Sequence, residues 1–97
     1  METLITYDVS RRQPDVKKAL KALSYLDYWT ADQKTYYLPN TTLWKQNITQ
    51  AEALKEMQAV ITRLNQGQPL NNQIELERCV CVPVMPWAGI TGKEHKE

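Results

Sequence analysis

The stretch LITYDV, residues 4–9, alternates in character along its length and predicts the first strand of the fold. One face of this strand carries Ile5, Tyr7 and Val9, and we expect it to contact the core. The opposite face ends with Asp8, close to the carboxyl end of the strand. The first strand therefore presents a carboxylate on the side away from the core.

Two amphipathic helices are predicted on the carboxyl side of this strand. The first opens at Gln13-Pro14-Asp15, because proline suits the first helical position and an acid favours the positive end of the helix dipole. The second opens at Thr49, whose hydroxyl and the Glu52 side chain form a capping box. Apolar residues then recur at helical spacing, and Gly67 is a plausible stop.

The remaining apolar segments predict three further strands. Residues 34–38 and 41–46 are rich in aromatic and β-branched residues, and Pro39-Asn40 between them predicts a hairpin turn. Residues 27–33 are either an irregular lead-in or an extension of the second strand. Alternation over 74–84 predicts a long last strand.

The predicted order is strand, helix, strand, strand, helix, strand. This βαββαβ order is typical of an α+β, ferredoxin-like fold, with a four-stranded antiparallel sheet and two helices on one face. The length of 97 residues fits one domain, which we place at residues 1–90. The charged end, residues 91–97, is predicted to be disordered.

Composition restricts the function classes. Twelve Lys and Arg against eleven Asp and Glu give a net charge of +1, so no global charge favours nucleic acid or an anionic membrane. The absence of a signal-like start and of an apolar run of about 20 residues predicts a cytoplasmic protein with no membrane partner. Cys79 and Cys81 are then expected to be reduced, and one such pair with a lone His95 does not predict a zinc site.

The strand signature Thr6-Tyr7-Asp8-Val9, followed by Arg11-Arg12 and a lysine-bearing helix, resembles a known family. It is similar to the small CRISPR-associated proteins that act as integration scaffolds, some of which are described as metal-dependent nucleases. VapD-like and SinR-like proteins are broader kin, and residues 37–45 with Thr49 look most like the SinR-like branch. The resemblance spans residues 4–84 and implies a ferredoxin-like homodimer.

The resemblance implies a metal role for Asp8. In the family the matching acid lies at the dimer interface, so two copies of Asp8 would face each other and hold one Mg²⁺. Asp8 would then be the catalytic residue of an endonuclease. Carboxylate and water oxygens are the ligands that Mg²⁺ prefers. The structural alternative is that Asp8 caps the loop or pairs with Arg11 or Arg12.

A local group of basic residues follows the first strand. Such a group can contact the phosphates of RNA or DNA, although helix faces are often rich in lysine only because they are solvated. The candidate nucleic-acid-binding residues are Arg11, Arg12, Lys17, Lys18 and Lys21.

With both helices on one side, the other face of the predicted sheet is uncovered, and such a face usually marks an interaction surface. The resemblance adds that the segment after the last strand extends the sheet of a partner copy. The candidate dimer-interface residues are Leu4, Thr6, Cys79, Cys81, Met85, Trp87 and Ile90.

The sequence thus leads to alternative functional hypotheses. The first is a dimeric nucleic-acid-associated protein, either a Mg²⁺-dependent endoribonuclease or a nuclease-like scaffold. The second is a non-catalytic protein-interaction module of the same fold, such as an adaptor or a toxin–antitoxin-type partner. A small regulatory domain that binds a ligand on the open sheet face is a third.

Overall fold

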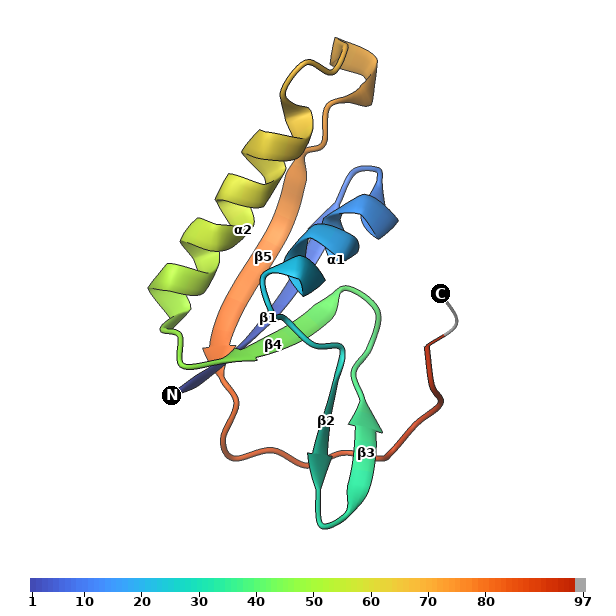
Figure 1. Cartoon of the computed structure of the whole chain (residues 1–97), viewed down its shortest axis with the longest axis vertical. Coiled ribbons are helices and arrows are strands. Elements are labelled where there is room, and N and C mark those ends of the chain that lie inside the picture. The colour runs from blue at the N-terminus through green and yellow to red at the C-terminus, as the bar shows by residue number, and fades with distance from the viewer. Residues whose placement is uncertain (96–97) are drawn as a thin grey trace.

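The structure is a computed structural model that describes residues 1–95. The predicted disordered tail, 91–97, therefore lies partly outside the described residues. The chain forms a mixed α+β fold with two α-helices and two antiparallel sheets (Figure 1). The elements are β1 (Glu2–Val9), α1 (Gln13–Ala22), β2 (Tyr28–Ala31), β3 (Lys34–Tyr37), β4 (Thr42–Gln46), α2 (Gln50–Asn65), the short 3-10 helix η1 (Leu70–Asn72) and β5 (Leu76–Pro83).

The main sheet has three antiparallel strands in the order β4-β1-β5, so the first strand of the chain is the central one. Its predicted core face is confirmed, because Ile5, Tyr7 and Val9 are all buried. They form one apolar core with residues of both helices, among them Leu20 of α1 and Met57 of α2. The predicted capping box of Thr49 is also present at the start of α2.

The predicted hairpin of residues 34–38 and 41–46 is wrong in its pairing. Strand β3 pairs with β2, and β4 pairs with β1, so the chain has a three-stranded sheet and a separate hairpin instead of one four-stranded sheet. The cause is the turn at Asp32 and Gln33, which both have positive φ angles, 51° and 64°. Two such residues in succession fit the tight turn whose twist matches a hairpin.

Beyond Glu77, strand β5 presents its side chains on the faces opposite to those predicted. Cys79 and Cys81 pack against the core under the helices, whereas Val80 and Val82 are exposed. A β-bulge near the end of β1 explains this, because it leaves Glu77 as an extra residue in β5. An alternation carried from residue 74 through the bulge therefore assigns every later side chain to the wrong face.

The second face of the sheet is partly covered by the chain itself. The β2–β3 hairpin and the segment after β5 meet there in a second apolar cluster, the aromatic cluster. Figure 1 shows this segment passing the lower part of the hairpin, and the Tyr37 amide donates to the Thr91 carbonyl at 3.0 Å. The cluster consists of Trp29, Leu38, Trp44 and Val84, with Leu4, Tyr36 and Trp87 packed against it.

Candidate functional site

Asp8 lies on the face away from the helices, as the alternation of the first strand predicts. Its side chain is 52% exposed, and its Oδ2 accepts a hydrogen bond from Arg78 Nε at 2.7 Å. The partner is thus the residue opposite Asp8 on β5, and neither Arg11 nor Arg12. The hydrogen bond and the charge of Asp8 raise the pKa of the Arg78 guanidinium, so the guanidinium stays charged.

Metal ligands do not gather around Asp8 within the described part of the chain. Among residues 1–95 there is no group of three or more His, Cys, Asp or Glu side chains that could hold a metal ion. A Mg²⁺ site at Asp8 needs further oxygen ligands. It therefore stays a prediction that depends on a second molecule.

Cys79 and Cys81 have the chemistry of packing residues. Burial, followed by the influence of Cys81, raises the pKa of the Cys79 thiol to about 11, and burial also raises the pKa of Cys81. Thiols with a raised pKa stay protonated at neutral pH and are poor nucleophiles and poor metal ligands. The prediction that Cys79 and Cys81 lie on the open face is wrong, because the bulge described above turns both side chains toward the core.

The two arginines of the basic group form hydrogen bonds with other residues of the chain. Arg12 donates from Nη1 to the Leu64 carbonyl at 3.1 Å and from Nε to Asp15 at 2.8 Å. Arg11 donates to the Asn71 carbonyl. Because the Leu64 carbonyl lies near the carboxyl end of α2, the contact with Arg12 also complements the helix dipole.

Two of the three lysines of α1 meet at one buried acid. Lys17 Nζ and Lys21 Nζ lie 3.2 and 3.1 Å from Asp27 Oδ2, and the Asp27 side chain is only 9% exposed. Burial alone would raise the pKa of Asp27, but the hydrogen bonds and charges of Lys21 and Lys17 outweigh it and lower that pKa. His95 Nε2 lies 3.9 Å from the same oxygen.

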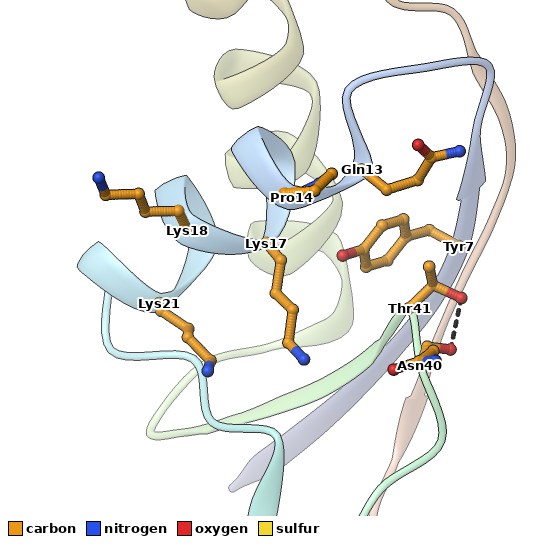
Figure 2. A pocket seen from close by; sticks show the side chains of 8 residues that line it. All are labelled: Tyr7, Gln13, Pro14, Lys17, Lys18, Lys21, Asn40 and Thr41. Carbon is orange, nitrogen blue, oxygen red and sulfur yellow. Dashed lines mark hydrogen bonds between the residues drawn. The ribbon is translucent and has the colours of Figure 1, made fainter. Parts of the chain in front are cut away.

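A cavity of about 720 Å³ opens between α1, β1 and the loop before β4 (Figure 2). The Tyr7 amide donates to the Thr41 carbonyl at 3.0 Å, which holds this loop against β1. In Figure 2 Lys17 and Lys21 extend to the same side, whereas Lys18 extends away from Tyr7. The cavity is lined by Tyr7, Gln13, Pro14, Lys17, Lys18, Lys21, Asn40 and Thr41.

The hydroxyl group of Tyr7 is an unusual feature of the core beside this cavity. Tyr7 is 3% exposed, and its hydroxyl is buried without a hydrogen-bond partner in the part of the chain that the structure describes. Burial, followed by the influence of Cys79, raises the pKa of Tyr7 to about 12, so the hydroxyl is a proton donor at neutral pH. An unpaired buried hydroxyl costs about 1–3 kcal/mol, and this one calls for an acceptor.

Sequence reasoning placed Tyr7 only in the core and missed its hydroxyl. The signal was present, because a tyrosine on the core face of a strand needs a partner for its polar end. The lysines of α1 were predicted as a site, and three of them do line one cavity. Arg11 and Arg12 do not line it.

The open face carries a second groove, of about 540 Å³, beside the aromatic cluster. Four of the predicted interface residues line it, namely Leu4, Thr6, Trp87 and Ile90. The Trp87 ring packs within its own chain, with its centroid 4.9 Å from those of Trp29 and Tyr36. Met85 is exposed outside this groove.

Comparison of the chain with protein-family models, with curated proteins and with solved structures finds no match. The family resemblance therefore stays a prediction from the sequence. None of the helices within residues 1–95 has the length and apolar character needed to cross a membrane.

Proposed function

We propose that the protein is a nucleic-acid-associated protein that binds phosphate groups beside α1. The observation that carries this proposal is a cavity lined by three lysines of α1 and by Tyr7, whose buried hydroxyl has no hydrogen-bond partner among the described residues. Lysine ammonium groups attract phosphates, and a hydroxyl supplies a hydrogen bond to a phosphate oxygen. In this proposal the positive charge comes from Lys17, Lys18 and Lys21, and the hydrogen bond to the phosphate comes from Tyr7.

Binding is better supported than cleavage. Asp8 is paired with Arg78, and it lies on the opposite face of β1 from Tyr7. A nuclease centre at Asp8 would thus be separate from the phosphate-binding cavity and would need acids from a second copy. A Mg²⁺-dependent endonuclease is the more specific hypothesis, and a scaffold that binds nucleic acid without cleaving it is the simpler one.

The binding test compares two exposed lysines. Lys18→Ala removes a charge at the cavity, and Lys55→Ala removes one from α2. Each lost phosphate contact should weaken binding by a similar factor for all sequences and lower the salt slope by about 1. Titration of labelled RNA and duplex DNA at several salt concentrations should show this for Lys18→Ala alone. Equal affinities and slopes for both variants would contradict the proposal.

The cleavage test uses the same labelled substrates with Mg²⁺ or Mn²⁺, with and without chelator. Metal-dependent cleavage that Asp8→Asn abolishes would support a nuclease. Binding without cleavage would support a scaffold. Cleavage that persists in Asp8→Asn would exclude Asp8 as the catalytic group.

The open face favours a second candidate, a protein-interaction module that pairs with its own copy in a homodimer. Val80 and Val82 are exposed there, and the groove beside the aromatic cluster adds apolar surface. Large exposed apolar patches usually mark interaction sites. Light scattering should give twice the chain mass for the wild type and the monomer mass for Val80→Arg, and a monomeric wild type would exclude this candidate.

A further inference from the structure

We propose that the outer edge of β5 binds a second copy of this chain, with the two β5 strands antiparallel about a two-fold axis at Val80. The two three-stranded sheets then form one continuous sheet. This inference deepens the second candidate function, the homodimer, on which it rests. It specifies the strand and the register through which the two copies pair.

The two edges of the main sheet differ in how the chain protects them. At β4 the Trp44 amide donates to the Leu26 carbonyl at 3.0 Å, and the Leu26 amide donates back at 2.9 Å. Strand β5 lies at the opposite edge, where it pairs with β1, and no strand of the described residues pairs with its outer side. A long unpaired edge is a template for pairing with another chain.

The backbone groups that face outward from β5 follow from the hydrogen bonds on its inner side. The Tyr7 amide, opposite Cys79, points away from β5 and donates to the Thr41 carbonyl. The Val84 amide donates to a carbonyl of β1 at 3.4 Å. Because the bonding direction alternates from residue to residue in an antiparallel strand, Cys79 and Cys81 direct their amides and carbonyls away from β1.

The side chains of β5 are incompletely covered on both faces of the sheet. Val80 and Val82 are 55% and 39% exposed on the open face. Cys79 and Cys81 face the core, yet both are only half-buried. A neighbouring strand along this edge would cover part of all four side chains, because side chains of adjacent strands contact one another within a sheet.

A two-fold axis at Val80 gives a register in which the strand complements itself. It places Cys79 opposite Cys81 of the second copy, so their outward amides and carbonyls form hydrogen bonds in both directions. On the open face Val80 contacts Val80 of the second copy, which is a favourable pair of β-branched side chains. Pro83, which lacks an amide hydrogen, and the bulge at Glu77 limit the pairing to the residues between them.

The charges of β5 are compatible with this register. Arg78 lies opposite Val82 of the second copy, and it pairs with Asp8 of its own chain. The two Arg78 side chains are about 13 Å apart along the strand direction, because each residue advances a strand by about 3.3 Å. Between residues 78 and 82, no two like charges therefore face each other.

The segment after β5 is engaged within its own chain. The Trp87 ring packs against the rings of Trp29 and Tyr36, and the Thr91 carbonyl accepts a hydrogen bond from the Tyr37 amide. To extend the sheet of a partner copy, this segment would have to leave the β2–β3 hairpin that it crosses (Figure 1). Strand β5 itself is therefore the better partner for the edge of β5.

The central experiment exchanges charges at the axis. Val80→Lys and Val80→Glu each place two like charges opposite one another, so each variant alone should have the monomer mass in light scattering. An equimolar mixture of the two places opposite charges there and should regain the dimer mass. Val82→Glu is the matched control on the same face of β5, and it should keep the dimer mass because it lies opposite Arg78 of the second copy.

A measurement on the wild type locates the contact without any substitution. The amides of Cys79 and Cys81 are hydrogen-bonded across the axis in the dimer, so dilution to the monomer should speed their exchange with deuterated solvent about tenfold or more. The Val80 amide, which bonds to β1, should exchange slowly at every concentration. Nuclear magnetic resonance follows these three amide signals separately.

The outcomes separate this inference from the homodimer candidate. Dimer mass, slow exchange of the Cys79 and Cys81 amides and rescue in the mixture would support both. A dimer in which these two amides exchange rapidly would show that the open faces meet, which overturns the inference and leaves the candidate standing. Slow exchange without rescue in the mixture would show that another segment lies along β5, and it would also overturn the inference. A monomer at all concentrations would overturn both.

Discussion

Tyr7 and Asp8 are neighbours on the central strand, yet they lie on opposite faces of the sheet and differ in exposure and in hydrogen bonding. Asp8 is exposed and is satisfied by Arg78 at 2.7 Å. Tyr7 is buried, and its hydroxyl has no partner in the described part of the chain. Residue type alone is therefore a weak guide to function. Asp8, whose charge suggests a function, pairs with a residue of its own chain. Tyr7, which has the position of a core residue, has a hydroxyl with no partner among the described residues.

The two faces also differ in how the chain covers them. The face of Tyr7 is packed under α1 and α2, and the cavity beside α1 interrupts this cover. The face of Asp8 is covered at one end by the aromatic cluster and is open around Val80. Stability should therefore depend mainly on the first face, and the following variants test this difference from the largest expected effect to the smallest.

The largest effect is expected from a cavity in the helix-side core. Leu20 is fully buried, so Leu20→Ala should lower the free energy of unfolding by about 2–5 kcal/mol. Val80 is 55% exposed on the other face, and Val80→Ala should cost about 0.5 kcal/mol or less. Urea unfolding of the two variants measures both values. Similar losses would mean that the two faces do not differ as described.

An intermediate effect is expected at Asp27, which joins the lysines of α1. Asp27→Asn should lower the free energy of unfolding at neutral pH by about 1.5–3 kcal/mol, through the loss of charged hydrogen bonds. Because the pKa of Asp27 is lowered by folding, its contribution is complete above the ordinary value of 3.8 and is lost as the pH falls through the lower folded value.

Urea unfolding of wild type and Asp27→Asn between pH 7 and pH 2 measures this pH dependence. The difference between the two proteins should be constant at higher pH and should shrink in the acid range below about pH 4. A difference that instead grows on acidification would show that Asp27 is not held as a carboxylate by the lysines.

The smallest effect is expected for the pair on the open face. Asp8→Asn and Arg78→Gln should each change the free energy of unfolding only slightly, because the pair is exposed and screened by salt. The double variant then gives the coupling energy between the two side chains. A coupling as strong as that of a buried ion pair would show that this face is more protected from solvent than the single chain indicates.

Local patterns predicted the parts of the fold that depend on a single segment. The core face of β1 and the capping box of α2 follow from alternation and from a cap that its own neighbours satisfy. Pairing could not be derived in the same way. The turn at Asp32 and Gln33 lacks the glycine that usually marks a tight hairpin, so the β2–β3 hairpin was missed.

The candidate site was predicted in part for a similar reason. The lysines of α1 are visible as a polar helix face, but the identity of Asp27 as their shared partner depends on the path of the chain after α1. The bulge at Glu77 reverses the faces of β5 and depends on pairing with β1. Whether a buried hydroxyl such as that of Tyr7 finds an acceptor is likewise decided by packing between distant segments.

Mapping phosphate binding onto the two faces of β1 by nuclear magnetic resonance tests the central claim most directly. Adenosine 5′-monophosphate, titrated into isotope-labelled protein, should shift the backbone amide signals of Tyr7, Lys17 and Thr41, at the cavity beside α1. The signals of Arg78 and Val80, on the open face, should stay in place. Shifts confined to Arg78 and Val80, or no shifts at all, would contradict the account.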